Sequence, residues 1–332
     1  MNRFVFVLNI FLSLLVWTSC SRASDPAKNE ETMTVSLNLT GDFDVDVSQD
    51  PLTRAGSSND AYAINVTYDN GRYAYGLFDN VGDMTITLLS NHKYTFECTL
   101  IKDARNTLFF GQAFNNTFSG YAYPFQTNSS NSTMISNSFI VGSGTYFTGF
   151  DLGSAHLAST TSPSTSNATS YPSTNRFYGR TTNYEPVQNG VINIYLKRAV
   201  FGARFVVSGV QEGNLRLQCG TFFDRTISAS GNGTYESVYT FTNPATVALY
   251  DTPLVATLSA NFTSSRGNLW NLTQTQDIQF KRNIMTTVYV QLNPDLSAAT
   301  ITTTEEEMDD DNIINMGINT DGLIDIIVNP ED

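Results

Sequence analysis

Residues 33–54 read MTVSLNLTGDFDVDVSQDPLTR and alternate between apolar and polar side chains from 33 to 47. The positions on the apolar side of this alternation are Met33, Val35, Leu37, Leu39, Gly41, Phe43, Val45 and Val47. Because successive side chains of a β-strand point to opposite faces, the stretch predicts one strand with an apolar face and a polar, acidic face. At ~3.3 Å per residue it would extend roughly 50 Å, far beyond an ordinary strand. Gly41 has no side chain to pack and marks the expected bend or bulge.

The segment after this strand has the composition of a loop that proteases cut. Asp50-Pro51 ends the strand, and residues 52–59 are mostly small or polar. Arg54 and Ala55 lie within this segment. Two interpretations stay open: an ordinary first strand followed by an ordinary loop, or a strand that is removed once the chain is cut at Arg54.

The first 19 residues predict an export signal. A single basic residue, Arg3, precedes an apolar run from Phe4 to Trp17 that is too short to span a membrane. Residues 17–20, WTSC, are similar to a bacterial lipoprotein box, although such boxes usually carry Leu where Trp17 stands. Lipid on Cys20 would tether the chain to a membrane surface. Ordinary cleavage after Ala23 is the alternative and would leave no lipid.

The composition predicts an exported all-β protein. The chain has 332 residues, enough for about two domains, and only 15% of them are charged. Tyr and Phe are abundant, and neither a long amphipathic helical pattern nor an apolar run long enough to span a membrane appears. The net charge is −13, and residues 55–332 alone carry 24 acids and 14 bases. An acidic chain argues against a nucleic-acid partner, because phosphate binding needs a basic face.

Two cysteines remain if Cys20 carries lipid. Cys98 shares one face of a predicted strand with Tyr94, Phe96 and Leu100, and Cys219 follows two leucines at the same spacing. Both therefore read as core positions, where Cys behaves as a small apolar residue. Independent thiols are the favoured interpretation, and a disulfide is the alternative that an oxidising compartment permits.

A β-hairpin opens the predicted first domain. Two alternating runs, 62–68 and 73–77, flank Asn70-Gly71, the strongest short-range hairpin signal. Strands at 84–88 and 94–100 follow, and four strands joined by short turns predict an antiparallel sheet. Residues 127–137 and 159–175 are rich in Ser, Thr and Asn and predict long loops, with a strand or short hairpin expected between them at 139–150.

Two β-branched runs mark the predicted second domain. Residues 191–207 are long enough for one long strand or two short ones, and the run 278–292 places mostly apolar side chains on one face from Ile284 to Leu292. Each run carries an apolar residue followed by Lys-Arg, at 196–198 and at 280–282. The alternative is that this similarity is a coincidence. Both motifs would then be strand edges whose positive charge prevents unwanted pairing.

These features, in this order along the chain, resemble the fimbrillin-like proteins (type V pilin superfamily) of Bacteroidales surfaces. The matching features are Cys20 with its leader, the strand before Arg54, residues 196–200, residues 280–288 and an extended C-terminus. The resemblance implies two transthyretin-like β-sandwich domains, at 55–190 and 191–332, after a signal peptide at 1–19 and a lipidated prosegment at 20–54.

The resemblance also implies a route of assembly. An Arg-specific protease would cut the Arg54–Ala55 bond, and removal of the first strand would open a groove that a strand of the next subunit fills. The donor strand in such pilins tends to be C-terminal, which corresponds to residues 312–329 here. Its candidate apolar side chains are Ile313, Met316, Ile318, Ile324, Ile326 and Val328. The alternative is that this tail completes the second domain's own sheet.

The acidic residues 305–311, EEEMDDD, precede that tail. Calcium loops space their oxygen ligands and usually include a turn Gly, whereas these acids are contiguous. A solvated linker is therefore expected here, with no metal.

Signatures of enzymes are absent from the sequence. It contains no GxGxxG, P-loop, HExxH or GxSxG motif, and neither His92 nor His156 has a partner at metal-ligand spacing. A glycosidase built on two dispersed carboxylates stays open as an alternative. No cofactor is expected.

Two functions follow from these observations. The first is a structural or adhesive fimbrial subunit at the outer membrane surface, with other fimbrial subunits and surface ligands as partners. The second is a monomeric, lipid-anchored surface protein that binds a glycan or another ligand. The candidate stacking residues of the second are Tyr121, Tyr123, Phe125 and Trp270, each of which could instead be an ordinary core aromatic.

Overall fold

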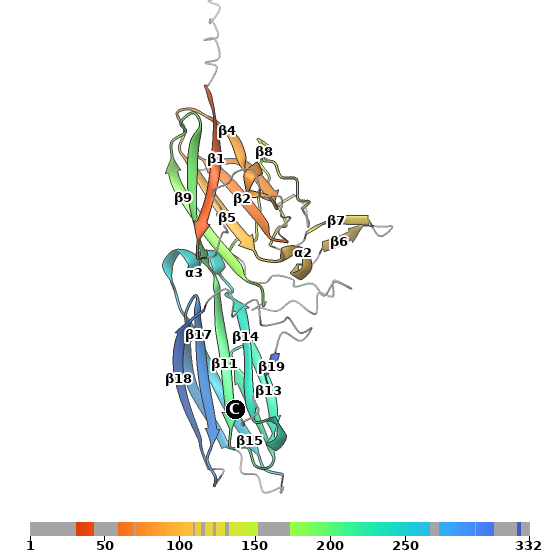
Figure 1. The fold of residues 1–332 in the computed structure, drawn as a ribbon, viewed down its shortest axis with the longest axis vertical. Helices are drawn as coiled ribbons and strands as arrows, with labels where there is room; N and C mark the ends of the chain where they lie inside the picture. Colours follow the sequence, from red (N-terminus) through yellow and green to blue (C-terminus); the bar gives the residue numbers. More distant parts are fainter. Residues whose placement is uncertain are drawn as a thin grey trace, which may run out of the picture. The chain divides into compact units, whose positions relative to one another are not determined.

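β-Strands make up most of the chain, as its alternating sequence predicts. Figure 1 shows the computed structural model, in which helical segments are few and short. The predicted all-β class is therefore confirmed. The structure describes residues 31–42, 59–69, 71–108, 110–113, 117–121, 124–129, 133–151, 173–265, 272–295, 297–308 and 324–326.

The first sheet combines strands that lie far apart in the sequence. Its order is β4 (Thr85–Leu89), β1 (Thr32–Gly41), β10 (Gly190–Arg198), β9 (Arg176–Tyr184), β5 (Tyr94–Ile101), β2 (Ala61–Tyr68), β3 (Gly71–Phe78) and β8 (Ile140–Val141). β1 pairs in parallel with β10, whereas β9 pairs antiparallel with both β10 and β5. β1 thus lies between β4 and β10.

The predicted hairpin is present as β2 and β3, which pair antiparallel with an irregularity between Val66 and Thr67. β5 pairs antiparallel with the other side of β2. β4, the fourth strand expected in this group, instead lies beside β1 at the end of the sheet. The short helix η1 (Val81–Asp83) precedes β4, and Asn80 caps it by accepting a hydrogen bond from the Gly82 amide.

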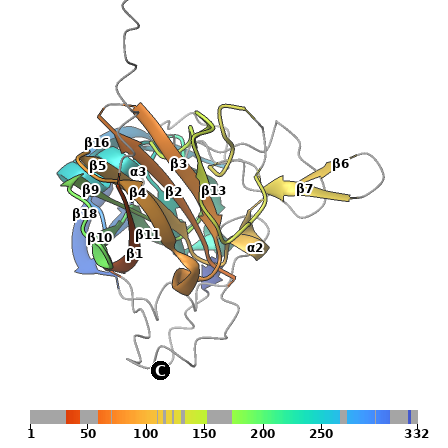
Figure 2. The same ribbon diagram turned by 90° about the horizontal axis from the view of Figure 1, so that it is seen from above.

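Irregular segments cover part of this sheet. The predicted strand or hairpin at 139–150 reduces to the two residues of β8, which pair with β3. α2 (Ala104–Thr107) follows β5, and β6 (Phe110–Ala113) pairs with β7 (Thr117–Tyr121). Figure 2 shows this hairpin outside the first sheet.

β2 contributes side chains to two cores, one on each face of the first sheet. Tyr62, Ile64 and Val66 of β2 point into a core that also contains side chains of β1, β4, β5 and β10. Ala61 and Ala63 of the same strand point into a smaller core on the other side. β2 is therefore buried on both faces, whereas alternate residues of β1, β4 and β10 in the same sheet are exposed.

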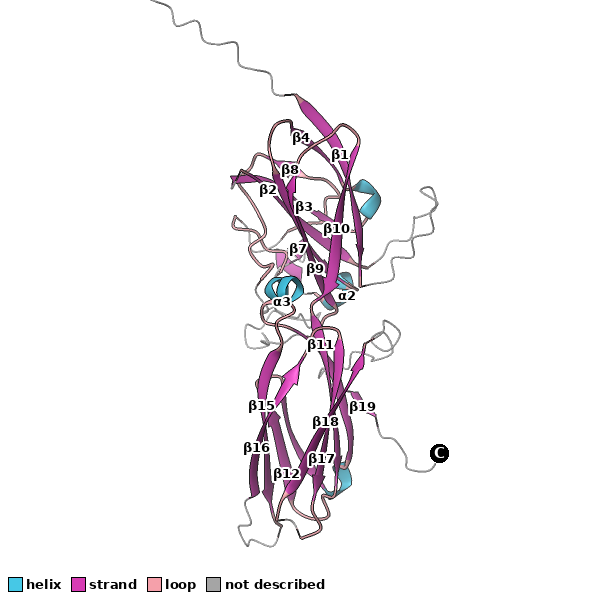
Figure 3. Cartoon of the chain, turned by 90° about the vertical axis from the view of Figure 1, so that its left-hand side faces the viewer, coloured by secondary structure: helices cyan, strands magenta, loops and turns pink. Residues whose placement is uncertain are grey.

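Two further sheets face each other to form a sandwich (Figure 3). One has the order β18 (Ala299–Glu307), β17 (Ile284–Leu292), β11 (Val200–Ser208), β14 (Gly233–Thr240) and β19 (Ile324–Ile326). The other has the order β13 (Phe223–Ser228), β12 (Asn214–Cys219), β15 (Leu254–Thr263) and β16 (Leu272–Phe280). η3 (Ala229–Gly231) and α3 (Pro244–Tyr250) lie between these strands in the sequence. Inward residues of both sheets form one core.

The run 191–207 forms two strands, and these belong to different sheets. Ile192, Ile194 and Leu196 of β10 lie in the core of the first sheet, whereas Phe201 and Phe205 of β11 lie in the core of the sandwich. The chain thus passes from one core to the other within the run 191–207, where Ala199 separates β10 from β11. The domain boundary predicted at 190/191 stays a prediction. Within the described ranges, no helix is long and apolar enough to cross a membrane.

Candidate functional site

β1 fills a slot between β4 and β10. Its register with β10 runs from Val35 opposite Gly190 to Gly41 opposite Leu196. On its other side, the Leu37 amide donates to the Met84 carbonyl oxygen at 2.9 Å. Neighbouring strands therefore bind the backbone of β1 along both edges.

The apolar face of β1 points into the larger core of the first sheet, the first core. Val35, Leu37 and Leu39 are buried, and Met33 is half-buried. Burying three aliphatic side chains stabilises the fold by roughly 5–9 kcal/mol, an upper bound because an unfolded chain already hides some surface. The described strand ends at Gly41, so the predicted continuation through Phe43, Val45 and Val47 lies outside the described residues.

Gly41 is needed for a close approach to β10. A Cβ at this position would collide with the carbonyl oxygen of Leu196. The next amide, that of Asp42, donates to the same carbonyl oxygen at 3.0 Å. This geometry explains the glycine in an otherwise alternating strand.

Asp42 joins β1 to a group of charged and polar residues that we call the junction cluster: Asp42, Tyr195, Lys197, Arg198, Asp251 and Arg282. Oδ2 of Asp42 accepts from Arg282 Nη1 at 2.6 Å and from the Arg198 amide at 3.2 Å. Oδ1 of Asp42 accepts from the Tyr195 hydroxyl at 2.8 Å. Three donors from residues more than 150 positions later in the chain therefore hold this carboxylate.

Asp251, which follows α3, occupies the other side of Arg282. Its Oδ1 lies 2.7 Å from Arg282 Nε, and its Oδ2 lies 3.2 Å from Lys197 Nζ. Hydrogen bonds from Arg282 and Lys197 lower the pKa of Asp251. The hydrogen bond to Asp42 raises the pKa of Tyr195, because a tyrosinate could not donate to the carboxylate.

Arg198 links the cluster to the following strands. Its side chain is 1% exposed, and Nη1 donates to Asn283 Oδ1 at 2.6 Å and to the Met308 carbonyl oxygen at 3.2 Å. Its guanidinium carbon lies 5.2 Å from the centre of the Phe177 ring, within reach of a cation–π interaction. The Arg282 guanidinium in turn donates to the Arg198 carbonyl oxygen at 3.4 Å.

The two Lys-Arg motifs of the sequence therefore meet in one place. Sequence inspection found the motifs but not Asp42 or Asp251, the acids that hold them. Asp42 lies in the same alternation as Asp44 and Asp46, so no local signal in the sequence distinguishes it.

Several predicted site residues lie outside the described residues. They are Cys20, Phe43, Val45, Val47, Arg54, Ala55, Ile313, Met316, Ile318 and Val328. Ile324 and Ile326 are in β19, whose backbone pairs antiparallel with β14 of the same chain, with Ile326 opposite Thr234. Lipidation, cleavage and strand donation thus stay proposals.

The predicted acidic linker is wrong for its first three residues. Glu305, Glu306 and Glu307 end β18, which pairs antiparallel with β17. The residues before them are mostly β-branched Thr, which favours a strand. Glu305 lies 2.7 Å from Lys281 Nζ, and Glu306 lies 2.7 Å from Arg204 Nη1. The described part of this acidic run therefore forms ion pairs along an edge strand.

The remaining candidate groups are structural. Cys98 and Cys219 are free, buried and in different cores, which agrees with independent thiols. His92 pairs with Asp69 in a turn, and no group of metal-ligating side chains occurs among the described residues. Tyr121 and Phe125 are buried in the smaller core of the first sheet, so neither can stack on a glycan; Tyr123 and Trp270 are outside the described residues.

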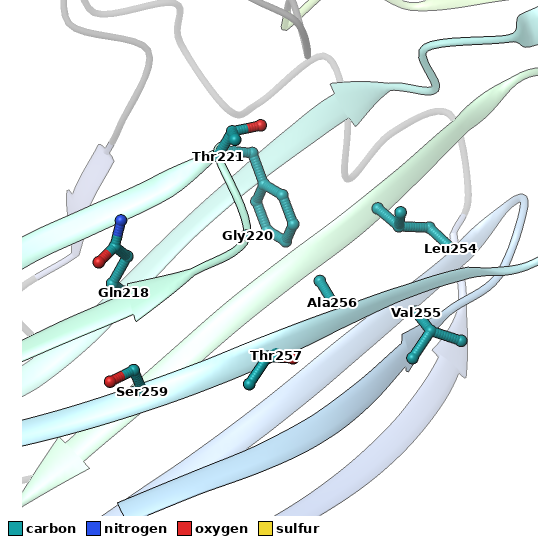
Figure 4. Close-up of a pocket in the computed structure, with 9 residues that line it drawn as sticks. Gln218, Gly220, Thr221, Leu254, Val255, Ala256, Thr257 and Ser259 are labelled. Carbon is teal, nitrogen blue, oxygen red and sulfur yellow. The ribbon is translucent and has the colours of Figure 1, made fainter. Parts of the chain in front are cut away.

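An open pocket of about 390 Å³ lies in the sandwich, where the turn after β12 meets the start of β15. Figure 4 shows Gln218, Gly220 and Thr221 on one side and Leu254 and Val255 on the other. Its lining contains no charged side chain and none of the residues predicted from the sequence.

No protein-family model and no curated protein matches the chain. Solved structures do resemble it. The tip fimbrial protein Mfa3 of Porphyromonas gingivalis is 9% identical, with a TM-score of 0.35, over 83% of this chain and 100% of that one. The fimbrial anchor protein Mfa2 of the same organism is 9% identical, with a TM-score of 0.36, over 83% of this chain and 98% of that one.

A fimbrial assembly protein of Parabacteroides distasonis is 10% identical, with a TM-score of 0.34, over 84% of this chain and 96% of that one. All three of these structures are named as fimbrial proteins.

Proposed function

We propose that the chain is a structural or adhesive fimbrial subunit that exchanges its first strand for a strand of another subunit. It would be exported as a lipoprotein through Cys20, cut between Arg54 and Ala55, and assembled at the outer membrane surface. The observation that carries this proposal is the position of β1 in a slot between β4 and β10.

Covalent connectivity makes β1 separable. β1 is the first described strand, and residues 43–58, which include Arg54, connect it to the rest of the chain. After a cut at Arg54, only non-covalent contacts would hold residues 1–54. Neither β4 nor β10 needs to be unthreaded for such a strand to leave.

Removal of β1 would leave an unfavourable groove. Val35, Leu37 and Leu39 would vacate the first core, and backbone groups of β4 and β10 would lose their partners. Exposed apolar surface and unpaired backbone groups both cost free energy. An incoming strand would restore both the apolar burial and the backbone hydrogen bonds, as in strand addition between subunits.

The C-terminal tail is the proposed donor. Within one chain, the described part of the tail, Ile324–Ile326, pairs with β14 at the edge of the sandwich. The same contact also fits the alternative in which the tail only completes its own sheet.

Cleavage and assembly can be tested together. The chain is treated with an Arg-specific protease, and the N-termini of monomers and polymers are sequenced. We expect Ala55 as the new N-terminus, polymers without residues 33–47, and neither product from an Arg54→Gln variant. Polymers that retain residues 33–47 would contradict the proposal.

A further inference from the structure

We propose that the junction cluster is a carboxylate-binding site that sets the register of the strand in the β1 slot, and that Asp321 of a second copy replaces Asp42 there. This inference rests on the proposed strand exchange, in which Asp42 leaves together with β1. It adds a specific ionic contact to an exchange that otherwise depends on apolar burial and backbone pairing.

The donors of this site stay behind when β1 leaves. Asp42 belongs to the segment before Arg54, whereas the Tyr195 hydroxyl, the Arg198 amide and Arg282 Nη1 belong to the segment after it. These donors come from two backbone segments that are fixed by pairing: β10 in the first sheet, and the turn between β16 and β17 in the sandwich. The site is therefore built before any second strand arrives.

The chemistry of the vacated site selects an anion. Once Asp42 has left, the two cations Arg282 and Lys197 would share the carboxylate of Asp251. The side chains of Arg282 and Asp42 are only 18% and 19% exposed, so water and salt screen their attraction less than at an open surface. A guanidinium, an amide and a hydroxyl that converge on two oxygens match a carboxylate.

Position along the strand gives the site its selectivity. Asp42 follows directly after the last paired residue, Gly41, which lies opposite Leu196. A carboxylate can reach Arg282 only if the apolar residues of the same strand occupy the positions of Val35, Leu37 and Leu39. A strand displaced by two residues would still bury apolar side chains, but it would lose the ionic contact.

The C-terminal tail contains a segment with this spacing. Residues 314–321, INMGINTD, match residues 35–42, VSLNLTGD, with apolar side chains at the first, third and fifth positions and Asp at the eighth. Thr320 stands where β1 has Gly41, so we expect the incoming backbone to leave the ladder one residue earlier. Residues 324–331, IDIIVNPE, are a weaker match, because their acid is the longer Glu331 and their first three residues pair with β14.

The test uses the full chain with a site-specific protease sequence inserted within residues 50–56. After nicking, the bound N-terminal fragment is displaced by an excess of a fluorescent peptide of residues 312–332, followed by anisotropy. We expect the Asp321→Asn peptide to bind about tenfold more weakly than the unmodified peptide, the usual loss for a hydrogen-bonded ion pair. The Glu331→Gln peptide should bind like the unmodified peptide.

A variant of the receiving site tests the same contact from the protein's side, as in a double-mutant cycle. In the nicked Arg282→Gln protein the unmodified and Asp321→Asn peptides should bind equally, and Arg282→Lys should restore part of the difference. Circular dichroism of each variant checks that it is folded. The inference would be overturned if the unmodified and Asp321→Asn peptides bound equally to the nicked protein that retains Arg282. It would also be overturned if only the Glu331→Gln peptide bound more weakly. If no peptide enters the nicked protein, the proposed strand exchange itself fails.

Discussion

At the residue scale, Arg282 joins two acids that lie more than 200 positions apart in the sequence. One guanidinium contacts Asp42 through Nη1 and Asp251 through Nε. Arg is suited to this role because its planar group presents several donors in fixed directions. Partial burial makes these contacts stronger than those of an open surface pair.

Replacing Arg282 with Gln should therefore lower the free energy of unfolding by about 2 kcal/mol, the size expected for hydrogen bonds to charged groups. Arg216 offers a matched control, because it forms a two-point ion pair with Asp224 at a well-exposed site. The Arg216→Gln variant should change stability much less, because solvent screens exposed ion pairs. Urea unfolding of both variants makes the comparison; equal losses would contradict it.

The junction cluster should also give stability a dependence on acid pH. Because hydrogen bonds from Arg282 and Lys197 lower the pKa of Asp251, the folded state holds its proton less tightly than the unfolded state. The resulting stabilisation is present above the ordinary carboxyl pKa of about 4 and is lost as the pH falls through the lower folded value. When the pH is lowered from 6 to 3, the free energy of unfolding should fall less steeply for Asp251→Asn than for the unmodified chain.

The two core thiols should be unreactive in the folded protein. Burial raises the pKa of Cys98 and raises that of Cys219 to about 12, so little thiolate forms near neutral pH. In a Cys20→Ser variant we expect no labelling by a thiol reagent at pH 8 without denaturant and labelling of both cysteines in urea. Mass spectrometry counts the labels, and a disulfide in the folded protein would contradict the structure.

At the scale of the element, β1 combines strong apolar anchoring with a polar outer face. Leu37 is 6% exposed and lies in the first core, whereas Thr40 of the same strand is exposed. The strand should therefore tolerate changes on one face only.

The variant Leu37→Ala should lower the free energy of unfolding by about 2–4 kcal/mol, because it removes buried methyl groups and leaves a cavity. Thr40→Ala, the matched control on the other face, should change it by less than about 0.5 kcal/mol. After nicking at Arg54, Leu37→Ala should also speed the release of the N-terminal fragment. A similar effect of both substitutions would mean that β1 is not held by its apolar face.

β18 illustrates how an edge strand is protected from unwanted pairing. It lies at one end of its sheet, and Glu305–Glu307 place exposed carboxylates along that edge. Charged side chains on an edge oppose the addition of another strand. We therefore expect intermolecular strand pairing at the β1 slot and not at β18.

At the scale of the whole molecule, net charge affects how copies meet. Residues 55–332 carry 24 acids and 14 bases, so cut subunits repel one another. Salt screens this repulsion over a Debye length of about 10 Å at 0.1 M. Light scattering of cut subunits should show faster assembly in about 0.1 M salt than in about 0.01 M salt. Slower assembly in salt would indicate that attraction at sites such as the junction cluster controls the rate.

Local sequence patterns determined the all-β class and several elements of this protein. Alternation identified the buried side of β1, Asn70-Gly71 identified the β2–β3 hairpin, and the spacing around Cys98 placed it in a core. Each of these features depends on side-chain direction within a few neighbouring residues. The sequence patterns did not predict β9, because its second half, from Arg180 to Tyr184, is polar and mostly exposed.

Only the tertiary structure decided which strands pair and which charges meet. The sequence contains no local signal that β1 pairs with β10, that β4 leaves its neighbours, or that β10 and β11 belong to different sheets. The junction cluster depends on all of these pairings, because they bring Asp42, Asp251 and Arg282 together. Side-chain alternation is a property of one strand, whereas sheet order reflects competition among all strands for the same backbone partners and the same core.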